Sequence, residues 1–323
     1  MDDKLIEVKN LRISFYHENE SIQVVRGFDL SMDSGEILGI LGESGSGKTV
    51  SATSILRLED EAGSIDSGAI LFNGTDLLAL SEKEYRKIRG NRISYVFQNA
   101  SSALNPYKKI GLQLTEVLKN HKLPFSRTIV LDVLKEVGIE EADTIYDMYP
   151  FQLSGGQNQR IMIAQGIISK PDLLIADEPS SSIDASLRKT VLDLLKYINE
   201  KSHMAIILIT HDFDVAKYLC DRLIIMYGGL VMEEGDVKDI FETPLHPYTE
   251  ELIKCANSLN RGDSPVYTLE GTAPTPFQFK DECPFFSRCK ERLPECIDEI
   301  PQIIESNNRK VRCIKYKKGL KDV

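Results

Sequence analysis

The feature that most constrains this chain is a glycine-rich stretch between an apolar run and a helical pattern. Residues 42–49 read Gly-Glu-Ser-Gly-Ser-Gly-Lys-Thr, which fits the phosphate-loop pattern G-x-x-x-x-G-K-[ST]. The apolar residues 37–41 before it predict a buried strand, and residues 50–58 after it have a helical pattern. A plain glycine turn with a chance lysine would not need these flanks. The stretch therefore predicts a loop whose backbone N–H groups surround phosphate oxygens.

Two carboxylates follow a second apolar run. Residues 173–176 predict a strand, and Asp177 and Glu178 stand at its end. In phosphate-loop enzymes an aspartate in this position helps to hold Mg²⁺, together with the hydroxyl that here belongs to Thr49, while Lys48 reaches the β- and γ-phosphates. Glu178 is then a candidate general base for an attacking water. Alone, the pair would more simply cap the next helix.

The remaining pattern alternates strands and helices. Residues 93–97 and 205–210 are near-continuous apolar runs, which suit parallel strands that are covered on both faces. Residues 186–200 repeat apolar side chains at helical spacing, and residues 222–235 predict a hairpin that turns at Gly228 and Gly229. These patterns predict an α/β fold.

The composition bounds the location and the partners. The net charge of −10 is weak support against a nucleic-acid partner. The longest apolar runs, such as residues 205–209, are too short to cross a bilayer, and the N-terminus has no apolar stretch like a signal peptide. We therefore expect a cytoplasmic chain whose membrane work is done by a partner.

A pentapeptide ahead of the Asp177 strand defines the class. Residues 153–157 read Leu-Ser-Gly-Gly-Gln and resemble the signature motif of ABC ATPases. Gln98 matches that family's Q-loop glutamine, His211 its switch histidine and Asp184 its D-loop aspartate. The adenine-stacking aromatic is assigned to Phe15, with Tyr16 as the alternative. The resemblance implies that ATP and Mg²⁺ are bound by Phe15, Gly42, Ser44, Gly45, Ser46, Gly47, Lys48, Thr49, Val50, Gln98, Ser154, Gly155, Gly156, Gln157, Asp177 and Asp184.

The same resemblance implies roles and a fold. Glu178, His211 and Gln98 would be catalytic, and Thr49, Gln98 and Asp177 would hold Mg²⁺. In this family two domains clasp ATP between the phosphate loop of one and the signature of the other. The implied fold is a P-loop NTPase, ABC-type nucleotide-binding domain with a RecA-like core, an antiparallel β subdomain and a helical signature subdomain at about residues 99–165.

Features outside the catalytic motifs resemble the ATPase subunits of oligopeptide and dipeptide permeases. Residues 101–106 read Ser-Ser-Ala-Leu-Asn-Pro, residues 246–249 read His-Pro-Tyr-Thr, and residues 283–289 read Cys-Pro-Phe-Phe-Ser-Arg-Cys. The resemblance implies an ATPase on the cytoplasmic face of the membrane that powers peptide import. Its partners would be a second, unlike ATPase, two transmembrane permease subunits and, indirectly, an extracytoplasmic solute-binding protein. We place the nucleotide-binding domain at residues 1–258 and a small Cys-containing C-terminal domain at residues 259–323.

Alternatives and departures remain. The same engine could import nickel or a metal chelate, and more remote alternatives are a soluble ABC ATPase or a redox or metal sensor on an ATPase fold. Ser182 and Ile183 replace the family's usual Ala-Leu in the D-loop, and Asn158 stands where a basic residue is common. Neither change removes a catalytic group, so we expect an active enzyme.

Four cysteines crowd the end of the chain. Cys283, Cys289, Cys296 and Cys313 have the spacing C-x5-C-x6-C-x16-C, which lacks the tight pairs of a zinc knuckle. Their chemistry leaves an iron–sulfur cluster, zinc and plain reduced thiols open, in that order. The permease resemblance implies a [4Fe–4S] cluster, and we expect it to be structural because a small tail needs a staple.

Overall fold

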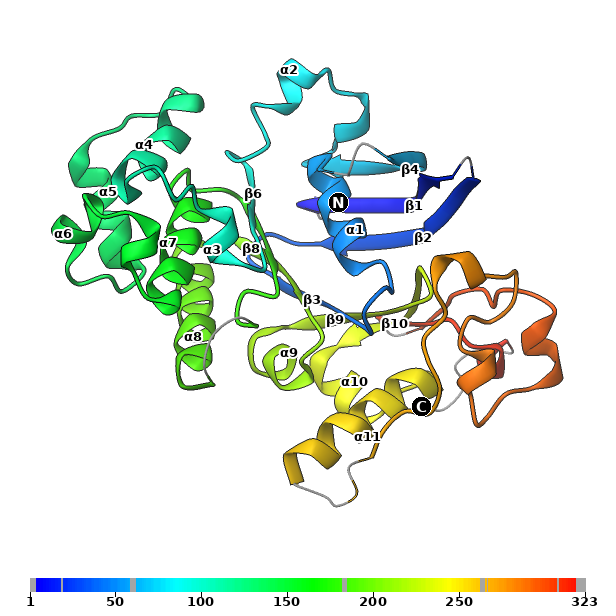
Figure 1. Cartoon of the computed structure of the whole chain (residues 1–323). Helices are drawn as coiled ribbons and strands as arrows, with labels where there is room; N and C mark the ends of the chain where they lie inside the picture. Colours follow the sequence, from blue (N-terminus) through cyan, green and yellow to red (C-terminus); the bar gives the residue numbers. More distant parts are fainter. Residues whose placement is uncertain are drawn as a thin grey trace. The chain divides into compact units, whose positions relative to one another are not determined.

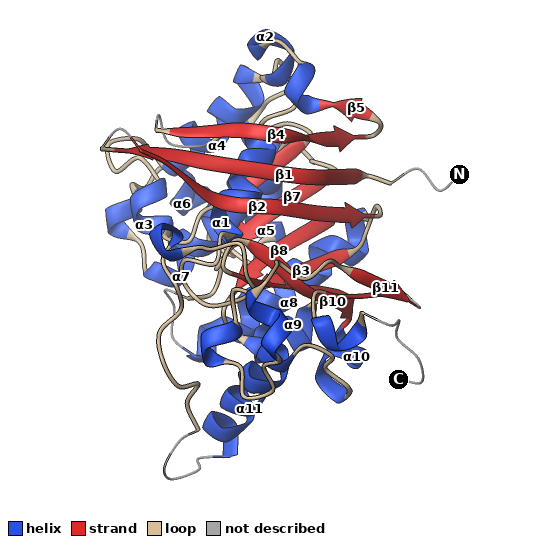
Figure 2. Cartoon of the chain, turned by 90° about the vertical axis from the view of Figure 1, so that its right-hand side faces the viewer, coloured by secondary structure: helices blue, strands red, loops and turns tan. Residues whose placement is uncertain are grey.

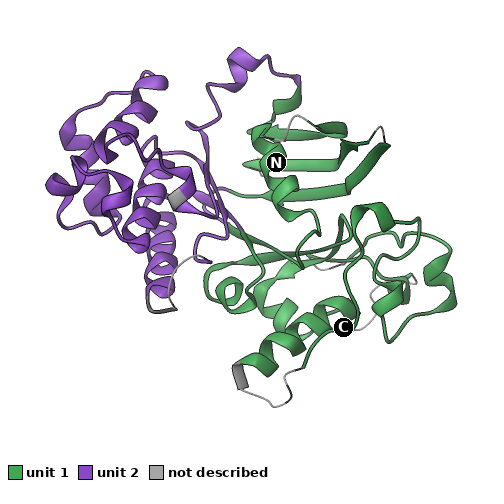
Figure 3. Ribbon diagram, viewed as in Figure 1, with its two compact units in different colours: residues 1–33, 37–78, 209–323 green, residues 34–36, 79–208 purple. Residues whose placement is uncertain are grey.

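The chain divides into two parts by its internal contacts. The computed structural model describes residues 4–18, 20–58, 62–181, 185–261, 265, 267–306 and 308–317. Unit 1 comprises residues 1–33, 37–78 and 209–323, and unit 2 comprises residues 34–36 and 79–208 (Figure 3).

Unit 1 begins with an antiparallel sheet, whose long strands lie side by side in Figure 2. The strand order is β2-β1-β4-β5. Apolar side chains on β1, among them Ile6, Val8 and Ile13, are buried. The strands are β1 (Ile6–His17), β2 (Glu20–Met32), β4 (Gly63–Phe72) and β5 (Thr75–Asp76).

A second group of strands in unit 1 carries the phosphate loop. Its order is β11-β12-β10-β9-β3, and β3 pairs in parallel with β9. All residues of β3 are buried, as expected for a strand covered on both faces. The strands are β3 (Ile37–Leu41), β9 (Arg222–Tyr227), β10 (Leu230–Asp236), β11 (Ile304–Ser306) and β12 (Arg309–Val311), and the helices of unit 1 are α1 (Lys48–Thr53), α9 (Phe213–Leu219), α10 (Val237–Glu242) and α11 (Pro247–Arg261).

The C-terminal segment, residues 267–317, packs into the core of unit 1. It contains short 3₁₀ turns and the β11–β12 hairpin, and β12 pairs with β10 (Figure 1). Cys283, Phe285 and Cys296 belong to the same apolar cluster as Leu41 and Tyr227. The segment therefore shares a core with the strands that precede it, and the expected small Cys-containing domain is not confirmed as a separate body.

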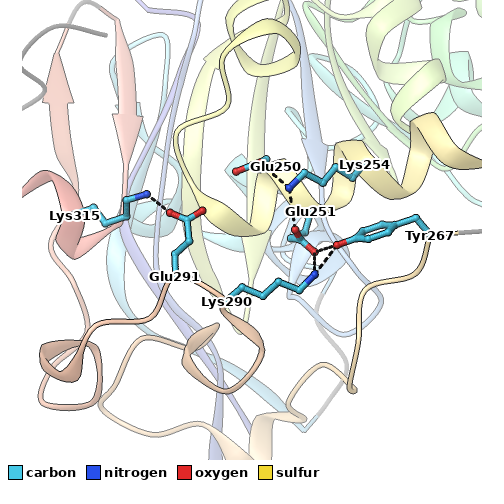
Figure 4. A network of polar contacts seen from close by, with 7 residues as sticks. All are labelled: Glu250, Glu251, Lys254, Tyr267, Lys290, Glu291 and Lys315. Carbon is cyan, nitrogen blue, oxygen red and sulfur yellow. Dashed lines mark hydrogen bonds and ion pairs between the residues drawn. The ribbon is translucent and has the colours of Figure 1, made fainter.

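Polar contacts join the same segment to α11 (Figure 4). The carboxylate of Glu251 accepts hydrogen bonds from Tyr267 Oη, from Lys290 Nζ at 3.3 Å and from Lys254 Nζ at 3.2 Å. Burial alone would raise the pKa of Glu251, but these hydrogen bonds outweigh it and the pKa lies below its ordinary value. An ion pair between Lys315 and Glu291 lies within the segment.

Unit 2 combines three strands with most of the helices. Its strands are adjacent in the order β8-β7-β6, and β6 pairs in parallel with β7. They are β6 (Ile93–Val96), β7 (Leu173–Asp177) and β8 (Ala205–Thr210), whose last residues belong to unit 1. The helices are α2 (Glu82–Tyr85), α3 (Ala100–Ala103), α4 (Ile110–Asn120), α5 (Arg127–Glu136), α6 (Ala142–Tyr146), α7 (Gly155–Ile167) and α8 (Ala185–Ser202).

Several local predictions from the sequence are confirmed. The strands after which the loop and the carboxylates were expected exist as β3 and β7, and the 222–235 hairpin turns at Gly228 and Gly229 between β9 and β10. The expected helix over residues 186–200 is α8. Among the described residues, no helix is long and apolar enough to cross a membrane.

Candidate functional site

The phosphate loop occupies the connection between β3 and α1 in unit 1. The N–H of Ser46 donates to the carbonyl of Glu43 at 3.2 Å, which closes a turn. The N–H of Gly229, in the β9–β10 turn, donates to the carbonyl of Ser46 at 3.2 Å and ties the loop to the sheet. Ser44, Gly45 and Thr49 are exposed, whereas Ser46 is buried. The loop therefore exposes part of its surface to solvent, while its backbone is hydrogen-bonded to the β9–β10 turn.

Lys48 is folded across its own loop. Its Nζ donates to the carbonyls of Gly42 at 2.7 Å and Glu43 at 2.9 Å. Only 8% of Lys48 is exposed. A buried ammonium needs such acceptors, and phosphate oxygens are the stronger ones that this type of loop binds. Lys48, near the end of the loop, is therefore hydrogen-bonded to the first two residues of the same loop.

Asp177 closes strand β7 of unit 2. Tyr95, on the neighbouring strand β6, donates from its Oη to Asp177 Oδ2 at 2.8 Å. Burial, reinforced by the Asp177 charge, raises the pKa of Tyr95, so its hydroxyl stays a donor. Asp177 is only 7% exposed. A tyrosine hydroxyl therefore fixes the orientation of the carboxylate.

Glu178 follows directly and has a strained backbone. Its φ of 44° lies in the left-handed region, which is uncommon for a residue with a side chain. Gln98 donates from Nε2 to Glu178 Oε2 at 2.7 Å. In unit 2 the structure thus brings together Gln98, Asp177 and Glu178, three residues that the sequence singled out. Such local strain is typical of functional positions.

The signature stretch forms the start of helix α7. Ser154 is the N-cap: its Oγ accepts from the N–H of Gln157 at 3.2 Å, and Gln157 Oε1 accepts from the N–H of Ser154 at 3.0 Å. This capping box satisfies N–H groups at the helix start. Ser154 and Gly155 are exposed, and Ser154, Gly156 and Gln157 line a cavity of about 420 Å³. The predicted motif is therefore displayed at a helix N-terminus that carries partial positive charge.

The remaining predicted site residues lie on other elements of the chain. His211 is exposed directly after β8, ahead of α9, which Asp212 caps. Phe15 is half-buried on β1 opposite Ile22, and Tyr16 is exposed. The assignment of Asp184, with Ser182 and Ile183, lies outside the described residues. The roles of all these residues stay predictions.

Sequence reasoning missed residues that hold the motif side chains. Tyr95 orients Asp177, and Gln159 donates from Nε2 to the carbonyl of Pro179 at 2.7 Å, which links α7 to the end of β7. Tyr248 and Arg288 contact the phosphate loop from distant parts of the chain. Tyr248 lies in the His-Pro-Tyr element and Arg288 in the cysteine stretch. The sequence therefore showed both elements, but it did not show that they contact the phosphate loop.

The predicted iron–sulfur cluster is wrong, and zinc in its place is not supported either. Within the described parts of the chain, no three His, Cys, Asp or Glu side chains are grouped so that they could hold a metal ion. Cys283, Cys289 and Cys296 pack against one apolar cluster, whereas Cys313 belongs to another with Val311. Burial raises the pKa of Cys283 to about 12 and that of Cys313 to about 11, which disfavours the thiolate that binds metal. None of the four forms a disulfide within the described residues.

Comparison with protein families identifies two regions. Residues 25–181 match the family model described as ABC transporter, and residues 232–296 match the one described as oligopeptide/dipeptide transporter, C-terminal region. The second region spans α11 and three of the four clustered cysteines.

Individual relatives match over nearly the whole chain. The oligopeptide transport ATP-binding protein AppD of Bacillus subtilis is 39% identical over 97% of this chain and 97% of its own length. The dipeptide transport ATP-binding protein DppD of Bacillus subtilis is 40% identical over 96% of this chain and 94% of its own. The oligopeptide transport ATP-binding protein OppD of Escherichia coli is 37% identical over 93% and 89%.

Solved structures show the same fold for most of the chain. The ATP-binding cassette MJ0796, in a dimeric post-hydrolysis state bound to ADP and Pi, superposes with a TM-score of 0.65 at 28% identity. It covers 72% of this chain and 98% of its own length. The structure of cbiO1 from Clostridium perfringens, part of the cbiONQ complex, also gives 0.65 at 28% identity and covers 75% and 92%.

Proposed function

The chain belongs to the ATP-binding subunits of the oligopeptide and dipeptide branch of the ABC transporter family, and from this premise we propose that it hydrolyses ATP to drive peptide import. The branch is supported by AppD, DppD and OppD, whose names specify oligopeptide or dipeptide transport. Nickel import and a soluble, non-transport role have no comparable support among these relatives.

One observation carries the enzymatic proposal. At the end of β7, Gln98 holds the carboxylate of Glu178 at 2.7 Å, next to an Asp177 that Tyr95 orients. A general base needs a carboxylate fixed in one direction so that an attacking water is aligned. The strained backbone of Glu178 is consistent with such a role.

The remaining groups supply phosphate binding. The N–H groups of the phosphate loop and Lys48 Nζ would bind the β- and γ-phosphates, with Lys48 exchanging the loop carbonyls for phosphate oxygens. The oxygen donors of Thr49, Gln98 and Asp177 are of the type that Mg²⁺ prefers and would hold it. A bound Mg²⁺ neutralises charge on the phosphate oxygens. His211 would contact the γ-phosphate, and Phe15 would stack on adenine.

The partners follow from the signature. The exposed α7 N-terminus with Ser154, Gly155 and Gly156 would cap ATP held by a second, unlike ATPase subunit, and Asp184 would contact the same partner. This pair would act beneath two membrane permease subunits on the cytoplasmic face, with a solute-binding protein delivering the peptide. Residues 259–323 would be the branch-specific extension of the nucleotide-binding domain.

The test is a pair of substitutions in the chain assembled with its membrane and ATPase partners. Glu178→Gln should still bind ATP but lose turnover by at least about a hundredfold, because the amide cannot accept the water's proton. Lys48→Ala, as the matched control, should lose ATP binding itself. Full turnover in Glu178→Gln would remove this carboxylate from the mechanism. ATP binding unchanged in Lys48→Ala would refute the phosphate site.

A further inference from the structure

Glu43, the second residue of the phosphate loop, is held through three of its groups. Its carboxylate accepts two hydrogen bonds from Arg288, one from Nη1 to Oε2 at 2.6 Å and one from Nη2 to Oε1 at 3.1 Å. Its backbone N–H donates to Tyr248 Oη at 3.0 Å. Its carbonyl accepts from Lys48 Nζ at 2.9 Å. Arg288 and Tyr248 both come from the region that marks the oligopeptide/dipeptide branch.

Arg288 is also held by contacts other than the one with Glu43. Its side chain is only 4% exposed. Nη1 also donates to Tyr227 Oη at 3.0 Å, and Nε donates to the carbonyl of Glu270 at 2.9 Å. Burial alone would lower the pKa of Arg288, but the hydrogen bonds that it donates to Glu43 and Tyr227 outweigh this effect, and the pKa is raised. A bidentate pair of this kind sets direction as well as distance.

Tyr248 is fixed by packing. It is fully buried, and its ring centroid lies 4.5 Å from that of Tyr227 and 5.2 Å from that of Phe285. Its N–H donates to His246 Nδ1 at 3.0 Å, so the His-Pro-Tyr element orders its own tyrosine. Phe285, from the cysteine stretch, is also fully buried and contacts both tyrosine rings. The two branch motifs therefore meet in one aromatic cluster beneath the loop.

Such a support affects how a phosphate loop binds. The loop recognises phosphate through backbone N–H groups, whose directions depend on the loop conformation. A loop already held in one conformation loses less entropy when the ligand binds. The guanidinium also neutralises the Glu43 carboxylate, which would otherwise repel phosphate from within the loop. Both effects raise affinity for the nucleotide without touching it.

We propose that Arg288 and Tyr248 are positioning residues for ATP: through Glu43 they fix the phosphate loop, so the C-terminal segment sets the affinity of this subunit for the nucleotide. The proposal rests on the proposed function, because it requires that the loop binds ATP. It gives a role to the His-Pro-Tyr and Cys-Pro-Phe-Phe-Ser-Arg-Cys elements that involves no metal.

The experiment measures binding of mant-ATP with Mg²⁺ to the full chain by fluorescence titration. Arg288→Gln should raise the Kd about tenfold, the usual size of a lost charge-assisted hydrogen bond. Glu43→Gln should raise the Kd by less, because it loses the same pair but also removes the carboxylate that would repel phosphate. The double variant should have a Kd for mant-ATP no higher than that of the weaker-binding single variant, because both substitutions remove the same ion pair. Arg288→Lys should fall between, since lysine keeps the charge but not the fork. In ATPase assays KM should rise while kcat changes by less than about twofold.

A matched control separates positioning from general destabilisation. Lys310 lies in the same segment and pairs with Glu234 at 3.1 Å. Lys310→Gln should leave the Kd for mant-ATP within about twofold of wild type even where it lowers Tm, because this pair joins β12 to β10 and not to the phosphate loop. If Arg288→Gln does not fold, Tyr248→Phe keeps the buried ring, removes only the hydroxyl and should still raise the Kd about threefold.

The outcomes distinguish this proposal from the one on which it rests. Wild-type Kd values in Arg288→Gln and Glu43→Gln, with binding still abolished by Lys48→Ala, would overturn the positioning role alone. A similar loss in Lys310→Gln would also overturn it. A wild-type chain that does not bind mant-ATP would overturn both proposals.

Discussion

Replacing Gly42 with alanine should destabilise the chain far more than the same change at Gly45 in the same loop. Gly42 has a φ of +152°, and a Cβ placed on it would lie 2.1 Å from the carbonyl oxygen of Met226 and 2.9 Å from Ser46 Oγ. Met226 belongs to β9, which is paired with β3, so that carbonyl cannot retreat without disturbing the sheet. Gly45 has a φ of +79°, and an added Cβ would meet no atom within 4 Å.

The two costs can be estimated separately. At Gly42 a rarely populated backbone conformation adds about 1–3 kcal/mol. The clash with a sheet carbonyl adds about the same amount again, for a total of roughly 2–6 kcal/mol with a midpoint of about 4 kcal/mol. At Gly45 only the left-handed backbone penalty of about 1–2 kcal/mol remains. The midpoints of the two ranges, about 4 and about 1.5 kcal/mol, differ by about 2.5 kcal/mol.

Thermal unfolding of the full chain by circular dichroism measures this difference. Each kcal/mol corresponds to roughly 2 °C in a chain of this size, so Tm should fall by about 8 °C for Gly42→Ala and by about 3 °C for Gly45→Ala. Urea unfolding on the same pair gives an independent value. Equal shifts for the two variants, or a larger shift for Gly45→Ala, would show that the Met226 contact does not constrain the loop.

Two further predictions concern buried titratable groups. Burial lowers the pKa of His246 to about 3, so the folded chain keeps it neutral while the unfolded chain protonates near pH 6.5. The contribution of His246 to the free energy of unfolding is complete above pH 6.5 and is lost as the pH falls, by about 2 kcal/mol at pH 5. His246→Asn should remove this part of the dependence of the free energy of unfolding on pH, measured by urea unfolding. An unchanged pH dependence would contradict the assignment. Cys283 and Cys313, with pKa values raised to about 12 and about 11, should react with iodoacetamide at pH 7.5 at least about a hundredfold more slowly in the native than in the denatured chain. Mass spectrometry reads this out, and rapid native labelling would mean that the thiols are ionised.

The sequence predicted what depends on local pattern. A buried strand, a glycine loop and a helix are fixed by neighbouring residues, so β3, α1 and the loop between them could be placed from residues 37–58. The carboxylates at the end of β7 follow the same logic, whereas the α7 signature was identified by its resemblance to a family. The family resemblance placed both Gln98 and Glu178 among the catalytic residues, whereas no local pattern in the sequence relates them.

Contacts between distant residues could not be read in this way. Arg288 lies 245 residues from Glu43, and no periodicity links them. The cysteine spacing was interpreted through its thiols, whereas the residues of that stretch that contact the loop and its support are Phe285 and Arg288. The metal prediction was wrong because it rested on the spacing of the cysteines along the chain, and the described residues form no group of side chains that could hold a metal ion.

The position of the C-terminal segment explains how a tail with few apolar residues of its own can be ordered without a metal or disulfide. Its buried side chains, Cys283 and Phe285 among them, join the cluster that contains Leu41, the last residue of β3 before the phosphate loop. A short segment gains stability by burying apolar surface against an existing core, and it needs no core of its own. The same arrangement makes the coupling reciprocal. If the tail favours the loop conformation that binds ATP, then bound ATP must stabilise the docked tail by an equal free energy.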